Sequence, residues 1–205
     1  KQQDSFTTKE YDQKLEYLQK FMPLYFKEYA ENWNKNVLLE EKIEATYKEM
    51  PLRGFVDKIE IDKSNVAIID YKTGDFKYKK GKQIFEKPLS VEKIEEFEAK
   101  GKELTHEHLH GGNYWRQAIF YKILLENSTK TYQSDWYLER AEFDFVEPNK
   151  DTGEFFKQKI VIDPQAVEIV KKQIEDTWQN IQDLKFDGCG KEECEYCNFE
   201  ENRKN

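Results

Sequence analysis

Long apolar runs and cysteines are both scarce in this sequence of 205 residues, and each scarcity excludes a class of protein. The longest apolar stretches, such as 119–125 and 66–69, fall well short of the roughly 20 residues that cross a bilayer as a helix, so no membrane crossing is expected. No charged and then apolar leader follows Lys1, so we expect an excised or processed piece without a secretory signal. The 3 cysteines, an odd number, lie together near the end, which argues against a disulfide framework and favours a reducing, cytoplasmic location.

Positive charge is also in deficit, because 41 acidic and 33 basic side chains leave a formal net charge of -8. A protein that grips a polyanion by itself normally presents a basic surface, so this balance argues against an autonomous nucleic-acid clamp. Four lysines nevertheless lie close together, at Lys77, Lys79, Lys80 and Lys82. They could touch phosphates while another domain or partner supplies most of the grip, or they could form a solvated loop, and the sequence leaves both readings open.

Aromatic residues are plentiful, with 14 Phe, 12 Tyr and 4 Trp, which excludes an unpacked chain. The length suits one domain with one core. We therefore expect a single domain over residues 1–205, with a charged insertion at 74–112 and a cysteine-bearing tail at 185–205.

The apolar periodicity predicts helices and strands in alternating groups. Helices are expected at 8–33 with a kink at Pro23, near 90–102, at 113–126 with Asn113 as its cap, and from Pro164 to about 184. Strands are expected at 36–50, 52–62, 65–71, 132–140, 143–146 and 155–162.

The strands at 52–62 and 65–71 are joined by the turn-forming sequence Asp62-Lys63-Ser64-Asn65, which predicts a hairpin. If the hairpin closes symmetrically around Lys63-Ser64, then Ile59 opposes Ile68 and Asp57 opposes Asp70. Alternation along each strand predicts that two sets of residues share a face: Phe55, Asp57, Ile59 and Ile61 in the first strand, and Val66, Ile68, Asp70 and Lys72 in the second.

Opposed carboxylates at Asp57 and Asp70 would destabilise the hairpin unless something offset their charge. A divalent cation such as Mg²⁺ or Mn²⁺ would do so, because hard ions take carboxylate, water and phosphate oxygens as ligands. Lys72 would reach the same place as a positive charge suited to a phosphate or an attacking water. The alternative is that Lys72 pairs with one of the acids in an ordinary surface network, and the hairpin by itself leaves both open.

The wording of this hairpin resembles a known family. The resemblance rests on Leu52-Arg53-Gly54-Phe55-Val56-Asp57-Lys58-Ile59 and on Ile68-Ile69-Asp70-Tyr71-Lys72-Thr73-Gly74. This pair of segments resembles the PD-(D/E)XK nuclease superfamily, and within it the RecB-like nuclease domains attached to recombination and repair helicases. The helix at 113–126 carries Gln117 and Tyr121, which match the Gln-x-x-x-Tyr motif of that group and share one helix face.

The resemblance implies an α/β fold with a restriction-endonuclease-like core, in which helices flank a central mixed sheet. It implies a Mg²⁺- or Mn²⁺-dependent DNA nuclease in which water attacks the phosphodiester. Asp57, Asp70 and the backbone carbonyl of Tyr71 would be the metal ligands and Lys72 the catalytic lysine, while Gln117 and Tyr121 would help hold the site and the DNA strand. A further acid of the family's pattern matches Glu40, three residues before Ile43, although the adjacent Glu41 is an alternative.

One departure from the family is the missing upstream histidine, because no His precedes His106. We expect that the chain is a C-terminal fragment of a longer protein or that the histidine has been lost. The implied partners are DNA and a helicase, on the same chain or as a separate subunit. No G-x-x-x-x-G-K-[ST] loop occurs in these residues, so ATP chemistry would lie outside them.

Two alternatives to a helicase-linked nuclease stay open. One is a catalytically inactive domain that serves as a DNA path or a docking scaffold, and the other is a standalone CRISPR-associated or restriction-type nuclease. Either would keep the fold. Only the first would lack cleavage.

Two further clusters could bind metal. Cys189, Cys194 and Cys197 are similar to the three cysteines that close some RecB-like nucleases, which implies a partial iron–sulfur or zinc site completed by a residue elsewhere in a longer protein. His106, His108 and His110 would share a face on an extended segment, but a solvated loop is the expectation.

Overall fold

The structure is a computed structural model that describes residues 7–73, 76, 83–130, 133 and 135–185. The chain divides into two compact units, residues 1–167 and 168–205. The first unit contains the whole β-sheet and is where the candidate site lies. No helix among the described residues is both long and apolar enough to cross a membrane.

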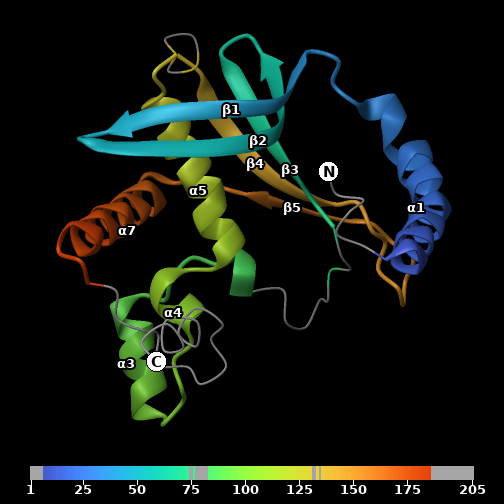
Figure 1. Ribbon diagram of the computed structural model, residues 1–205. Coiled ribbons are helices and arrows are strands. Elements are labelled where there is room, and N and C mark those ends of the chain that lie inside the picture. Colours follow the sequence, from blue (N-terminus) through green and yellow to red (C-terminus); the bar gives the residue numbers. More distant parts are fainter. Residues whose placement is uncertain (1–6, 74–75, 77–82, 131–132, 134, 186–205) are drawn as a thin grey trace. The chain divides into compact units, whose positions relative to one another are not determined.

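The core is a mixed sheet of 5 strands in the order β1-β2-β3-β4-β5, with helices beside it (Figure 1). The strands are β1 (Val37–Tyr47), β2 (Met50–Asp62), β3 (Asn65–Lys72), β4 (Tyr137–Phe145) and β5 (Phe156–Ile160). All neighbouring pairs are antiparallel except β3 and β4, which are parallel. The expected α/β fold with a central mixed sheet is confirmed, and β3 is its middle strand.

The β2–β3 hairpin closes in the register that its turn predicts. Ile61 pairs with Val66 and Ile59 with Ile68, and Lys63 adopts the left-handed φ of 59° that a tight turn requires. The pairing extends to Lys58 and Ile69. Asp57 and Asp70 are therefore the next residues along the two strands.

Strict alternation along β2 is wrong at one place. A Cβ on Gly54 would overlap the side chain of Leu124, so Gly54 faces the helix above the sheet, whereas Phe55 is 65% exposed. The irregularity lies where β1 pairing passes from Leu39–Lys58 to Glu41–Val56, beside Glu40, whose φ is 52°. Val56 and Ile59 are both buried, so alternation breaks between them, and Phe55 does not share the buried face of Ile59.

Helix α5 (Asn113–Glu126) packs against β1, β2 and β4 (Figure 1). Its buried side chains include Ile119, Ile123 and Leu124, which are fully enclosed. The N-cap is Gly112 and not Asn113. Glycine is required at this position because a Cβ at residue 112 would overlap the backbone of Ile84. The expected Asn113 cap is therefore wrong by one residue.

Helix α1 (Thr8–Tyr29) is followed by the short helix η2 (Ala30–Asn32). The capping box of Thr7 and Glu10 fixes its start, and Pro23 lies inside it. The Tyr25 hydroxyl donates to Asp144 of β4 at 2.5 Å. Asp144 alternates with Phe143, which packs on Tyr114 of α5, so α1 and α5 contact opposite faces of β4.

The remaining helices depart from the sequence expectation in part. They are η3 (Gln83–Phe85), α3 (Val91–Ala99), α4 (His106–His110) and α7 (Pro164–Gln182). The histidine segment is a helix, because Thr105 caps it by accepting from the backbone N–H of His108, and not the expected solvated loop. The expected strands at 132–140 and 143–146 are one continuous strand, β4, which begins at Tyr137.

Candidate active site

Asp70 lies near the end of β3 and is 5% exposed. Its Oδ1 is 2.5 Å from Nζ of Lys72, and its Oδ2 accepts hydrogen bonds from Nε2 of Gln117 at 2.7 Å and from the hydroxyl of Tyr121. A buried carboxylate keeps its charge only when it is paired and hydrogen-bonded, and these three donors meet that need. The structure thus brings four residues of the two sequence motifs into one network.

Asp57 joins this cluster from β2. Its Oδ2 accepts a hydrogen bond of 2.7 Å from the backbone N–H of Tyr71, the residue between Asp70 and Lys72. Burial, followed by the hydrogen bond to Asp70 and the charges of Asp70 and Asp57, raises the pKa of Tyr121 well above its ordinary value. Both carboxylates therefore act on the same phenol, which remains a proton donor.

The helix spacing of Gln117 and Tyr121 gives them a shared role in the network. They are four residues apart on α5, and Nε2 of Gln117 is 2.7 Å from the Tyr121 hydroxyl oxygen. Oε1 of Gln117 also accepts from Nζ of Lys72 at 3.3 Å. Gln117 thus bridges the acid and the base of β3.

Two aromatic residues that the sequence did not indicate surround Lys72. Its Nζ lies 4.9 Å from the ring centroid of Tyr114 and 5.4 Å from that of Phe143, distances at which an ammonium is attracted to a ring face. Tyr114 lies three residues before Gln117 on α5, and Phe143 pairs with Asp70 across β3 and β4. The first spacing is readable from the sequence, but the second needs the strand pairing.

Glu40 and Glu41 are neighbours in the chain but have different surroundings. Glu40 is exposed at the kink in β1, at the position opposite Asp57. Glu41 instead accepts from Nζ of Lys130 at 2.6 Å and from Nε2 of Gln133 at 2.9 Å. Glu41 is therefore engaged elsewhere, and a site role for Glu40 stays a prediction.

The donor set of the cluster fits a hard divalent cation. Asp57 and Asp70 supply carboxylate oxygens from adjacent strands, and the backbone of Tyr71 runs between them. Within the described ranges, no group of three or more His, Cys, Asp or Glu side chains could hold a metal. A cation here would therefore depend on two carboxylates and a carbonyl, with water or substrate oxygens completing its shell.

Several predicted features lie outside the described residues. These are Lys77, Lys79, Lys80 and Lys82 of the lysine cluster and Cys189, Cys194 and Cys197 of the tail. Of the histidines, His108 bonds to Gln83 and Thr105 and packs on Phe97. In the helix, His106 and His110 share a face, with ring centroids 4.6 Å apart, and His108 points elsewhere, so the shared face that an extended segment would give to all three histidines does not form.

Solved structures of other proteins resemble this chain, among them the following two. The chain aligns over 97% of its length with the structure named "Putative exonuclease" from Eubacterium rectale, at 13% identity and a TM-score of 0.51. It also aligns over 76% of its length with the crystal structure of SSO0001, at 16% identity and a TM-score of 0.38. The chain spans 65% and 57% of those two proteins, respectively. No curated protein matches it.

At 13% identity, the likeness to the structure named "Putative exonuclease" concerns the fold alone. The family model described as "PD-(D/E)XK nuclease superfamily" matches residues 2–201, which include both strands of the hairpin and the helix with Gln117 and Tyr121. The family model thus covers the carboxylate pair, the adjacent lysine and all five strands of the sheet. The chain belongs to the PD-(D/E)XK nuclease superfamily.

Proposed function

We propose that this chain is a Mg²⁺- or Mn²⁺-dependent deoxyribonuclease that hydrolyses phosphodiester bonds. The observation that carries the proposal is the convergence of Asp57, Asp70 and Lys72 at one end of the β2–β3 hairpin. Two acids and a base at adjoining positions are the groups that phosphodiester hydrolysis needs.

Asp57, Asp70 and the Tyr71 carbonyl would hold the cation. When bound, the cation would stabilise the charge that develops on the phosphate and lower the pKa of a coordinated water. Lys72 would be redirected from Asp70 toward the scissile phosphate or the attacking water, since the cation would then compensate the aspartate's charge. Tyr114 and Phe143 limit where the Lys72 ammonium can lie.

Gln117 and Tyr121 act as positioning residues. Both donate to Oδ2 of Asp70, so they fix the orientation of that carboxylate. Tyr121 keeps its proton because its pKa is raised, and it therefore remains a donor throughout the neutral range. A carboxylate whose rotamer is fixed in advance loses less freedom when it takes up a cation.

We further propose that the chain is the nuclease part of a DNA repair or recombination helicase–nuclease. The support is the RecB-like wording of the hairpin and the Gln-x-x-x-Tyr helix. The acidic chain would leave most of the DNA grip to the helicase part. This assignment predicts that DNA binding by the chain alone is weak and falls steeply with salt.

Cleavage assays test the proposal. Linear single-stranded DNA, double-stranded DNA and RNA are incubated with the chain in Mg²⁺ and in Mn²⁺, with Lys72→Ala and the exposed control Lys100→Ala in parallel. The wild type and the control should cut DNA, whereas Lys72→Ala should be slower by about 100-fold or more, since a lost charge at the reacting phosphate costs that much. A wild type that binds DNA but cuts neither single-stranded nor double-stranded DNA with either ion would contradict the proposal and favour an inactive scaffold.

A further inference from the structure

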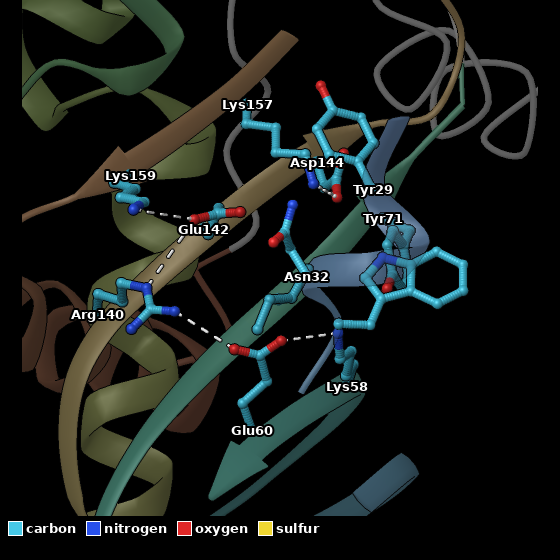
Figure 2. A pocket seen from close by; sticks show the side chains of 12 residues that line it. Tyr29, Asn32, Lys58, Glu60, Tyr71, Arg140, Glu142, Asp144, Lys157 and Lys159 are labelled. Carbon is cyan, nitrogen blue, oxygen red and sulfur yellow. Dashed lines mark hydrogen bonds and ion pairs between the residues drawn. The ribbon is translucent and has the colours of Figure 1, made fainter. Parts of the chain in front are cut away.

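A polar pocket lies on the other face of the sheet from Asp70. It has a volume of about 290 Å³ and is lined by residues of β2, β3, β4 and β5 together with Tyr29, Asn32 and Trp33 (Figure 2). Tyr71 lines this pocket, and its neighbours Asp70 and Lys72 point the opposite way along β3. The pocket is thus separate from the candidate nuclease site but shares one strand with it.

The charges around the pocket are unevenly paired. Its lining contains four basic and three acidic side chains, a surplus of one positive charge in a chain of net -8. Arg140 and Lys159 both approach Glu142, at 3.9 Å and 3.8 Å, which is too far for a hydrogen bond. Figure 2 shows these three residues together on one side of the pocket. Arg140 also donates from Nη2 to Oε2 of Glu60 at 3.3 Å, so Lys159 is the more loosely neutralised of the two cations on that side.

Two buried polar atoms of the pocket have no hydrogen-bond partner among the described residues. One is the donor Nε of Arg140, and the other is the acceptor Oδ1 of Asp144. Asp144 is 2% exposed, and its other oxygen is already taken by Tyr25 and by Lys157, at 2.5 Å and 2.6 Å. An unpaired buried polar atom costs free energy, so these two atoms indicate a ligand that accepts at Arg140 and donates at Asp144.

The side of the pocket that holds Asp144 also holds aromatic rings. Figure 2 shows Tyr29 and Tyr71 near Asp144, and Trp33 lines the same pocket. Nζ of Lys157 lies 3.7 Å from the Tyr29 ring centroid and thus joins the charged and aromatic parts. A planar heterocycle with N–H donors would suit this side, because aromatic rings stack on bases and the free Asp144 oxygen accepts from a ring or amino N–H.

We propose that this pocket binds one nucleotide, with its phosphate at Arg140 and Lys159 and its base at Asp144, Tyr29 and Trp33. The pocket volume of about 290 Å³ is close to the roughly 300 Å³ of the smallest ligand pockets, and it suits a single nucleotide. A free amino acid would satisfy both orphan atoms but leave the rings unused. A triphosphate, with about four negative charges, would exceed the surplus of one positive charge by far more than a monophosphate, with about two. The nucleotide could be a free nucleoside monophosphate or the phosphorylated end of a DNA strand.

Calorimetric titration in a metal chelator tests the proposal without requiring cleavage. The probes are the four deoxynucleoside 5′-monophosphates, the corresponding nucleosides, inorganic phosphate and a 5′-phosphorylated oligothymidylate. Lys159→Gln is the main variant, because its side chain is 65% exposed and its loss should not affect folding. Lys20→Gln, an exposed lysine of α1, is the matched control.

At least one monophosphate should bind at a single site, more tightly than either its nucleoside or inorganic phosphate. Lys159→Gln and Arg140→Gln should weaken binding about tenfold or more, as expected for the loss of a charge-assisted contact, while Lys20→Gln should not. In two-dimensional NMR, the side-chain N–H signals of Asn32 and Trp33 should shift on binding. A competing oligonucleotide identifies a strand end as a source, and one that does not compete identifies the free nucleotide.

Three results would overturn the proposal. The first is that no monophosphate binds. The second is that inorganic phosphate binds as tightly as a nucleotide, which would leave the aromatic side without a role. The third is that binding survives Lys159→Gln and Arg140→Gln but is lost in Lys72→Ala, which would place the nucleotide at the nuclease site.

Discussion

Removal of the Tyr121 hydroxyl tests whether the buried network of Asp70 stabilises the fold as well as orienting the carboxylate. In Tyr121→Phe, Asp70 loses one of its three donors, and Nε2 of Gln117 loses one neighbour. The ring keeps its volume, so no cavity forms. A hydrogen bond to a charged group contributes roughly 1.5–3 kcal/mol, and we expect the free energy of unfolding to fall by about that amount.

Urea denaturation, followed by circular dichroism, measures this loss. Tyr137→Phe is the matched control, because Tyr137 is 59% exposed and its substitution should change the free energy of unfolding by no more than about 0.5 kcal/mol. DNA cleavage by Tyr121→Phe should also slow by roughly tenfold, since about 1.4 kcal/mol of lost orientation corresponds to that factor. If Tyr121→Phe unfolds at the same urea concentration as Tyr137→Phe, the network does not stabilise the fold as described.

Three further predictions concern stability. Gly54→Ala should lower the free energy of unfolding by about 1–3 kcal/mol, because the new Cβ overlaps buried Leu124, and a urea midpoint no lower than that of the wild type would refute the overlap. Above the ordinary tyrosine pKa of 10.0, the wild type should lose stability with rising pH, because the pKa of Tyr121 is raised in the fold and only the unfolded chain ionises at this residue. The loss should be smaller in Tyr121→Phe by about 1.4 kcal/mol per pH unit. Parallel plots of unfolding free energy against pH for the two proteins would contradict this prediction. Asp163→Ala should cost about 1 kcal/mol, because Oδ1 of Asp163 accepts from the backbone N–H of Ala166 at the start of α7, whereas Asp163→Asn, which can still cap, should lose little in thermal melts.

The hairpin was predictable because its information is local. The turn at Lys63-Ser64 sets the register of β2 against β3, and alternation along β3 places Asp70 on the face of Ile68. Gln117 and Tyr121 were predictable for a similar reason, since four residues make one helical turn. Their contact with Asp70, however, depends on α5 packing against the sheet, which the motif resemblance implied and the periodicity did not.

Features that depend on several segments at once were missed. Alternation along β2 breaks between Val56 and Ile59, and no residue type in that stretch indicates it. Phe143 reaches Lys72 only through the parallel pairing of β3 with β4. The charged residues Arg140, Glu142 and Asp144 at every second position of β4 were visible in the sequence. The pairing of β4 with β5 was needed to show that they line a pocket.

The most direct test of the nuclease site is the rate of DNA cleavage by Asp57→Asn, Asp70→Asn and the double variant, in Mg²⁺ or Mn²⁺. Asparagine keeps the shape of each side chain and an oxygen that can accept from the Tyr71 N–H. If the two carboxylates serve one cation, each single substitution should slow cleavage about as much as both together, because groups that act as a unit are not additive. Cleavage at the wild-type rate by either single variant, or a loss in the double variant equal to the product of the two single losses, would contradict a shared site.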